Sequence, residues 1–578
     1  MDYISPENEI LNEIKDLVKE KGYIYVLCIL TIEEFCVAPE KLHEINTYTR
    51  LNENEINLLL GFFIQNGFDL SPPEYPQKIL EMKNKTKYLL KKLHSNFMKP
   101  FNRKIMIESK KRVPLQNYRE IRREFFNDGE ILKESIFYAG SGAYYFQYSD
   151  LLEKKYAYDI KWLKENKNFD LEKAKVITEK IKEKIDKKIS KIEFYDYSGY
   201  EFSDKCDEDV KTIGELHSYF KYFIDIDEID VDPEDDLIDL VWKKIYDGIF
   251  SLFIIEKSEF EEYEIDSFLK NFSIDLDHEN NEEFEGIGHF NIIEAKPILH
   301  LDKNKYFILN SISLYEAVYN SPFYWMSDDE EYEDEAWKNR GKVGEEITYE
   351  LLSDVFGSNS IYNSVLIKDG KNTVTDIDIL CLYKNKAIVV QVKSKKLTKL
   401  SRIGDDEQLA KDFKGAVQNA YEQGLKSRSS IFNENLKFID KNGNELTFSD
   451  DVNEVYILGI TTESYPSLTF HSNTLLDKKN EDPSLLVVSI FDLEILTHYL
   501  DNPKKFLDYV EQRTSKMEDT VSGDELHFLG MYLKEGNIQT DDKSLSIVLN
   551  YAELIDRDYA PKKLKLNISN HNNPLNKL

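Results

Sequence analysis

Cysteine is scarce in this chain of 578 residues, which has four: Cys28, Cys36, Cys206 and Cys381. They are scattered and form no CxxC pair, which argues against a disulfide framework and a zinc site and fits buried thiols in a reducing cytosol. The ten histidines include no HExxH spacing, so the sequence gives no support to a zinc hydrolase. We therefore expect a cytoplasmic protein.

Long apolar runs and positive charge are also in short supply. No stretch approaches the ~18 apolar residues of a membrane span, and the polar, acidic start MDYISPENEI does not resemble a signal peptide. With 75 Lys and Arg against 107 Asp and Glu, the formal net charge is -32. A chain this acidic repels phosphate as a whole, so the balance predicts solubility, weak non-specific DNA binding and a need for a partner or trigger.

Apolar and aromatic residues are plentiful, at 41% and 13% of the chain, so a sizeable core can form. The length predicts several domains. Helical spacing after Ser5-Pro6 and a break at residues 71–76 predict a helical subdomain over 1–98 and a mixed, helix-rich domain over 99–330. An acidic run at 328–335 precedes an α/β domain over 336–500, and a helical extension follows over 501–578.

The most informative stretch runs from Gly341 to Gln423. Its residues 374–380 and 387–392 are short β-branched runs, typical of two strands, and the polar residues 383–386 between them have hairpin length. A helix precedes the two strands, with an apolar stripe at Val343, Ile347, Leu351 and Val355, and a second helix follows them.

Three polar residues interrupt these strands where burial would be costly unless they were paired or bound to metal: Asp378 in the first, and Gln391 and Lys393 at the end of the second. Because side chains alternate along a strand, Gln391 and Lys393 share one face. Pairing as a hairpin would bring Asp378 close to both. The ordinary alternative is that these groups are solvated or ion-paired.

This arrangement resembles the PD-(D/E)xK nuclease superfamily in its Mrr-like and NERD-like branch, which has a glutamate helix, a strand aspartate, an (E/Q)xK strand and a helix with a glutamine. The resemblance implies a restriction-endonuclease-like α/β core, with a mixed sheet flanked by helices, attached here to a large helix-rich N-terminal region. It also implies a nuclease, and through Mrr-like proteins a role in bacterial restriction or anti-phage defence.

The resemblance also implies roles for individual residues. Asp378, Gln391 and Glu345 would hold Mg²⁺ or Mn²⁺, which prefer oxygen ligands, and Lys393 would act on the attacking water or the transition state. Adjacent Glu346 points about 100° away on the helix; the family's spacing from Gly341 favours Glu345. Asp376 shares a face with Asp378 and stays an alternative to it.

Residues 386–402 hold six basic residues and no acid, a local positive patch in an acidic chain. From this region we predict nucleic-acid contacts by Lys395, Lys396 and Arg402, and by Gln418 on the following helix, although an ordinary charged loop and a surface amide are the alternatives. We expect DNA as substrate, with RNA open, and a homo-oligomer or a regulatory partner protein.

A second hypothesis follows from Gln391, which stands where the commoner residue of the family is a glutamate. Losing that negative charge leaves open a catalytically inactive, nucleic-acid-binding or scaffold protein that keeps the nuclease fold. Metal-dependent cleavage, compared between the natural chain and variants at Asp378 and Lys393, discriminates between the two.

Overall fold

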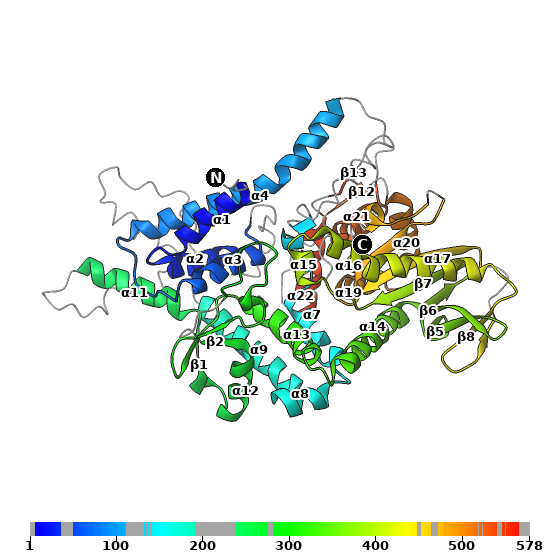
Figure 1. Ribbon diagram of the computed structural model, residues 1–578, viewed down its shortest axis with the longest axis horizontal. Helices are drawn as coiled ribbons and strands as arrows, with labels where there is room; N and C mark the ends of the chain where they lie inside the picture. The colour runs from blue at the N-terminus through cyan, green and yellow to red at the C-terminus, as the bar shows by residue number, and fades with distance from the viewer. Residues whose placement is uncertain are drawn as a thin grey trace. The chain divides into compact units, whose positions relative to one another are not determined.

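The computed structural model describes residues 6–35, 50–110, 132–133, 136–138, 142–190, 237–275, 281–447, 452–463, 472–479, 481–517, 520–522, 524–539, 546–548 and 551–565. The chain divides into two compact units (Figure 1). Unit 1 comprises residues 1–102 and 160–325, and unit 2 comprises residues 103–159 and 326–578. The predicted extension over 501–578 falls in the same unit as the α/β domain. Of the cysteines, Cys28 and Cys381 are buried free thiols, and the other two lie outside the described residues.

Unit 1 is mostly helical, as the sequence predicts for the N-terminal region. Its helices are α1 (Pro6–Leu17), α2 (Tyr23–Phe35), α3 (Glu53–Gln65), α4 (Gln77–Lys110), α8 (Ile160–Lys167), α9 (Leu171–Ile189), α11 (Leu237–Ser251), α12 (Glu262–Phe272) and α13 (Ser311–Ser327), of which α4 and α13 extend past the unit's limits. A small sheet of order β1-β4-β3-β2 is built from β1 (Ile254–Glu256), β2 (Ser273–Asp275), β3 (Ile298–His300) and β4 (Lys305–Phe307).

Helix α3 begins with a reciprocal capping box. The Asn52 side chain accepts a hydrogen bond from the Asn54 backbone N–H at 2.8 Å, and Glu55 Oε2 accepts one from the Asn52 N–H at 2.7 Å. Because the first N–H groups of a helix have no partner inside it, this box satisfies donors that are costly to leave unpaired.

We expect Asn52→Ala to lower the free energy of unfolding by about 1 kcal/mol, the usual cost of losing such a cap. Asn52→Asp keeps an acceptor oxygen and should change stability much less. Urea unfolding of the two variants measures the difference, and equal losses would contradict the capping role.

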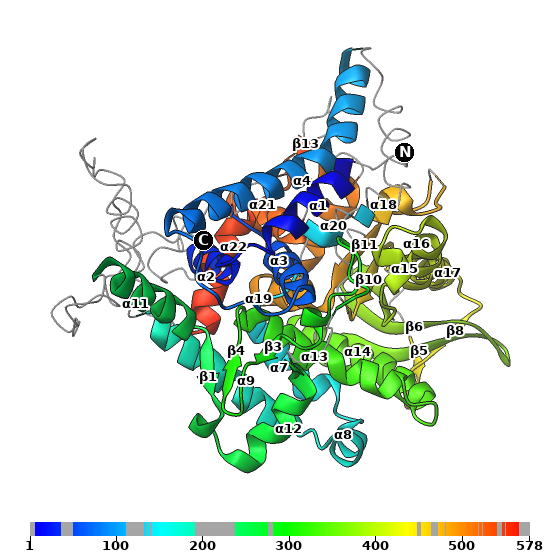
Figure 2. The ribbon, with the colours of Figure 1, turned by 60° about the vertical axis from the view of Figure 1, so that its left-hand side comes forward.

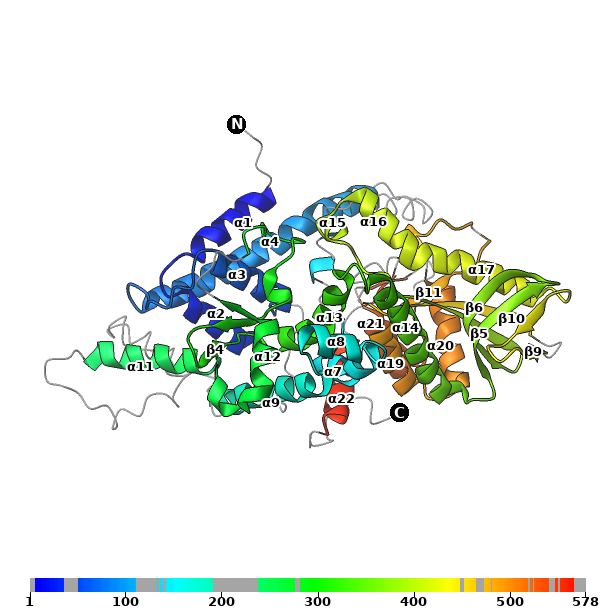
Figure 3. The same cartoon turned by 60° about the horizontal axis from the view of Figure 1, so that its bottom comes forward.

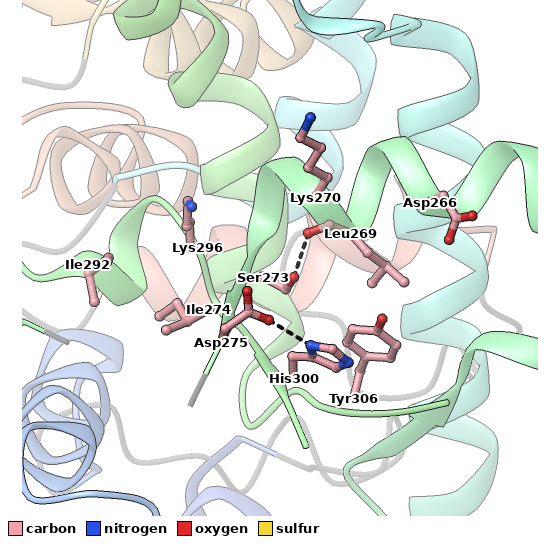
Figure 4. A pocket seen from close by; sticks show the side chains of 10 residues that line it. All are labelled: Asp266, Leu269, Lys270, Ser273, Ile274, Asp275, Ile292, Lys296, His300 and Tyr306. Carbon is pink, nitrogen blue, oxygen red and sulfur yellow. Dashed lines mark hydrogen bonds and ion pairs between the residues drawn. The ribbon is translucent and has the colours of Figure 1, made fainter. Parts of the chain in front are cut away.

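One side of the small sheet lines a cavity of about 410 Å³ (Figure 4). Strand register places Asp275, His300 and Tyr306 in one row across β2, β3 and β4. His300 Nδ1 lies 2.7 Å from Asp275 Oδ1, and its ring stacks on Tyr306 with 4.7 Å between centroids. The row is thus held by contacts within the sheet itself.

Unit 2 contains a mixed seven-stranded sheet of order β11-β10-β7-β6-β5-β8-β9. Its strands are β5 (Ile361–Asp369), β6 (Asn372–Tyr383), β7 (Lys386–Lys393), β8 (Lys437–Ile439), β9 (Glu445–Leu446), β10 (Glu454–Thr461) and β11 (Leu485–Ser489). Its helices include α7 (Tyr145–Lys155), α14 (Glu333–Phe356), α15 (Lys399–Arg402), α16 (Asp406–Phe413), α17 (Asn419–Ile431), α18 (Ser472–Leu475), α19 (Ile490–Tyr499), α20 (Pro503–Lys516), α21 (Glu525–Glu535) and α22 (Ala552–Lys563), and a two-stranded sheet pairs β12 (Thr520–Val521) with β13 (Ser546–Ile547).

The two predicted motif strands form the predicted hairpin. Strands β6 and β7 pair antiparallel, and Tyr383 faces Lys386 across a two-residue turn in which Lys384 has φ 53°. Most apolar residues of the two strands are buried, whereas Val374 and Leu382 are partly buried. A pleated surface of this kind suits β-branched side chains, so the β-branched runs form strands here. On its other edge β7 pairs in parallel with β10, which pairs in parallel with β11.

Helices cover both faces of this sheet. Figures 2 and 3 show α16 and α17 on one side of the strands and α14 on the other. Arg428 in α17 donates to the Val455 carbonyl, and Gly424 packs so closely on Ile457 that a Cβ there would lie 2.4 Å from its Cγ2. The fold is therefore the mixed α/β architecture with flanking helices that the sequence predicts.

Candidate active site

The site begins where β6 and β7 separate. Their pairing ends at Ile379 and Val390, and the next residues along this register are Asp378 and Gln391. Asp378 Oδ2 accepts a hydrogen bond from the Val392 backbone N–H at 2.7 Å, taking the place of a strand–strand bond. This contact holds the Asp378 carboxylate at the carboxyl end of β7. Asp378 is only 8% exposed there.

Gln391 and Lys393 stand on the face of β7 that is covered by α17. Gln391 is fully buried, and its Nε2 donates to the Asp376 carbonyl at 3.1 Å, while its Oε1 is buried and has no hydrogen-bond donor in the described part of the chain. The Lys393 ammonium lies 4.0 Å from Asp378 Oδ2. The structure thus brings together the acid, the amide oxygen and the lysine that the sequence singled out.

A glutamine that we did not predict completes this group. Gln423 in α17 accepts a hydrogen bond from Lys393 Nζ at 3.0 Å and donates one from Nε2 to Asp376 Oδ1 at 2.7 Å. It therefore ties the lysine to the second strand aspartate. Its presence five residues after Gln418 was the available signal, but the π-helical segment Lys414–Gln418 changes the helix register, and periodicity could not choose between the two glutamines.

Gln418 itself lies elsewhere. Its Oε1 accepts from the Asp477 N–H at 3.0 Å, and its Nε2 donates to the Asp477 carbonyl at 3.2 Å and to Glu422. These bonds attach the segment after α18 to the helix. Within the described part of the chain, the hydrogen bonds of Gln418 go to Asp477 and Glu422 and not to the residues around Lys393, so Gln418 has a supporting position.

Helix α14 passes close to the residues that directly follow β7 and β10. A Cβ on Gly344 would lie 2.3 Å from Thr462 Cγ2 and 3.2 Å from Ser394 Oγ, so only glycine allows this approach. The next residue, half-buried Glu345, is close enough to the strand residues to be affected by their charges. Its pKa is raised to about 7 by burial and by the Asp378 carboxylate, against the opposing effect of Lys393. Glu346 instead accepts a hydrogen bond from Tyr158 Oη at 2.7 Å.

Negative charge is concentrated at this site. Burial raises the pKa of Asp378, whereas Lys393 and the Val392 N–H lower it and Asp376 raises it further. The positive charge of Lys393 therefore lies beside three carboxyl groups, those of Asp378, Asp376 and Glu345. Carboxylates held this close are stabilised in their ionised form by a bound cation.

The predicted nucleic-acid residues follow β7 directly. Lys395 Nζ lies 3.5 Å from Asp412 Oδ1, and buried Asp412 also accepts from the Thr398 N–H at 2.7 Å and the Ser401 hydroxyl at 2.6 Å. This carboxylate therefore shapes the loop that carries the basic residues. Lys396 contributes to the positive field at buried Glu463, and Arg402 ends α15.

The donor set fits a hard divalent cation. Gln391 offers a buried oxygen for which the described residues supply no donor, and the neighbouring carboxyl groups of Asp378 and Glu345 have raised pKa values. Among the described residues no group of three or more His, Cys, Asp or Glu side chains is placed to hold a metal. A cation here would depend on two carboxylates, the amide oxygen and water, a set that suits Mg²⁺.

Comparison with known families agrees with this geometry. Residues 340–448 match the model of the nuclease-related domain, NERD. The NERD match includes Glu345, both motif strands and Gln423, and it confirms the predicted resemblance over this segment. Helix α7 and strands β10 and β11 lie outside the NERD match. No curated protein and no solved structure matches the chain significantly. Within the described residues, no helix has the length and apolar character needed to span a membrane.

Proposed function

We propose that this protein is a Mg²⁺-dependent nuclease that hydrolyses phosphodiester bonds in DNA. The observation that carries the proposal is the meeting of Glu345, Asp378 and Lys393 at the end of β7, where the buried Gln391 oxygen has no hydrogen-bond donor among the described residues. The NERD match supports nuclease-related chemistry in this segment.

Each residue has a distinct task in this proposal. Asp378 and Glu345, with the Gln391 amide oxygen, would hold the cation, which would offset phosphate charge and make water more acidic. The Lys393 ammonium donates a hydrogen bond to the attacking water or to the phosphate oxygen on which negative charge develops. Gln423 keeps the lysine amine beside Asp378. The Val392 N–H fixes the Asp378 carboxylate so that it need not reorganise.

DNA is the proposed substrate on the strength of the family resemblance, and the basic loop supports a polyanion. The loop carries Lys395, Lys396 and Arg402, all within nine residues of Lys393. It concentrates positive charge beside the site in a chain of net charge -32. A role in restriction or anti-phage defence, and an oligomeric or regulatory partner, stay predictions from the sequence.

The test is cleavage of plasmid, linear DNA and RNA by the full chain with Mg²⁺, with Mn²⁺ and with EDTA, for the wild type and Asp378→Asn. We expect Mg²⁺-dependent DNA cleavage by the wild type and its loss in Asp378→Asn. Asp376→Asn, in the same strand, tests the aspartate that the sequence leaves as the alternative ligand. Equal activity in all three proteins would overturn the proposal, and preferential RNA cleavage would change the substrate.

A binding-only protein is the second candidate, favoured by the neutral Gln391 at a position where a carboxylate would hold a metal more strongly. A gel shift that shows DNA binding, together with no DNA cleavage in the presence of any metal tested, would favour the binding-only protein over the nuclease.

A further inference from the structure

A segment outside the NERD match is attached to the acidic helix α14 along much of its length. The segment consists of α7 and the turn that follows it, residues 145–159, and we call it the strap. Lys154 pairs with Glu350, Tyr158 Oη donates to Glu346 at 2.7 Å, and the Lys342 ammonium lies 3.8 Å from the centre of the Tyr158 ring. These contacts fall on successive turns of α14, and of them the Lys154–Glu350 pair is exposed.

The strap ends at a buried carboxylate, that of Asp159. Asp159 Oδ1 accepts a hydrogen bond from Asn339 Nδ2 at 2.8 Å and another from Tyr332 Oη at 2.8 Å. Asp159 is 2% exposed and Asn339 6% exposed, so water cannot readily replace these bonds. One carboxylate thus joins the strap to the start of α14.

The helix residues that contact the strap lie on one side of α14. Residues 339, 342, 346 and 350 are spaced three or four apart and therefore share a face, whereas Glu345 lies roughly 100° from Glu346. A rotation of α14 by about 20° would move a side chain some 6 Å from the helix axis by about 2 Å. A strap that fixes this rotation would therefore also fix the distance of the Glu345 carboxylate from Asp378 and Lys393.

The chain passes between the two units three times, after residues 102, 159 and 325, and the strap ends at the second of these crossings. Unit 2 gives way to unit 1 directly after Asp159, and the chain returns to unit 2 at Met326, six residues before Tyr332. The Asp159–Tyr332 hydrogen bond therefore connects the outgoing and the returning segments at the start of α14.

We propose that Asp159 is a positioning residue, which with the rest of the strap fixes α14 and so sets the placement of Glu345 for the reaction. The inference rests on the proposed nuclease function for its catalytic consequence. Its structural part, that the strap holds α14, is measurable without any substrate.

The test compares Asp159→Leu, which removes the acceptor, with Asp159→Asn, which keeps the Oδ1 acceptor for Tyr332 and Asn339. In steady-state DNA cleavage with Mg²⁺ we expect Asp159→Leu to lower kcat by about tenfold or more, with KM within about threefold, because misplacement by an ångström or two is costly to catalysis. Asp159→Asn should stay within about threefold of the wild type. Lys154→Ala, which breaks only an exposed pair, is the control.

Hydrogen exchange in residues 339–350 is measured on the same proteins. We expect faster exchange in this stretch for Asp159→Leu and wild-type exchange for Asp159→Asn and Lys154→Ala. If Asp159→Leu does not fold, Tyr158→Phe removes a single hydroxyl contact to Glu346 and is expected to speed the same exchange to a smaller degree.

The outcomes separate the two proposals. A wild type that cleaves nothing would overturn the nuclease function, while hydrogen exchange would still judge the strap. Unchanged exchange and unchanged kcat in Asp159→Leu, or equal loss of kcat in Asp159→Asn and Asp159→Leu, would overturn the positioning role.

Discussion

Lys393→Met is expected to lower the rate of DNA cleavage by about 100- to 1000-fold, the loss that follows removal of one charge-stabilising donor from an active site. Methionine keeps the length and apolar stem of the side chain but removes the ammonium that lies 4.0 Å from Asp378 Oδ2 and donates to Gln423. Because a positive charge beside the carboxylates would be lost, we expect Mg²⁺ affinity to be unchanged or higher. The deficit should therefore appear in the chemical step.

Single-turnover kinetics at saturating Mg²⁺, together with a Mg²⁺ titration, measure these two quantities separately. Lys384→Met is the matched control, because it makes the same change at the exposed turn of the same hairpin. Equal rates for the two variants would remove Lys393 from the chemistry. A loss that excess Mg²⁺ restores would assign it to metal binding instead.

Glu463→Gln is expected to lower the free energy of unfolding by about 3–5 kcal/mol at pH 7, the cost of removing one partner from a buried charged group. Glu463 follows β10 and is in contact with the Arg340 guanidinium of α14, and its Oε1 lies 3.5 Å from Lys155 Nζ of the strap. All three side chains are buried. Neutral glutamine would leave the guanidinium, which stays charged at any ordinary pH, without its carboxylate.

The effect should depend on pH with a defined sign. The pKa of Glu463 is lowered to about 2, mainly by Arg340 and Lys155 against the opposing effect of burial. A carboxyl group whose folded pKa is depressed stabilises the protein above its unfolded value of about 4.3 and loses this contribution as the pH falls toward 2. The stability difference between wild type and Glu463→Gln should therefore shrink over that interval.

Lys155 has a different response, because burial lowers its pKa to about 7 despite the nearby Glu463. At neutral pH the carboxylate thus relies chiefly on Arg340. Urea unfolding from pH 7 to pH 3 measures the predicted difference. Glu350→Gln, which breaks an exposed pair with Lys154, is the control and should change stability by less than about 1 kcal/mol. A Glu463→Gln protein as stable as this control would contradict the buried network.

The β6–β7 hairpin could be predicted from the sequence because the residue patterns that indicate it are local. Alternating and β-branched residues determine strand type, and a two-residue period places Gln391 and Lys393 on one face whatever the rest of the chain does. A polar turn of hairpin length brings Asp378 back beside them. These features predicted the β6–β7 pair, the sequence of flanking helices and the candidate group at the end of β7.

The hydrogen-bond partners of those residues could not be predicted from the sequence, because they depend on packing between distant segments. Gln423 rather than Gln418 reaches Lys393, since a π-helical segment shifts the register of the covering helix. Glu346 contacts Tyr158, nearly two hundred residues earlier in the chain, which no local period can show.

Residue order and polarity were thus enough to predict Asp378, Gln391 and Lys393 as candidate site residues and to predict the strands that carry them. The close approach of α14 at Gly344, the attachment of that helix by the strap and the buried Arg340–Glu463 contact arose only from the folded chain. The reason is physical: backbone periodicity sets the direction of a side chain within its own element, whereas its neighbours are chosen by how whole elements pack.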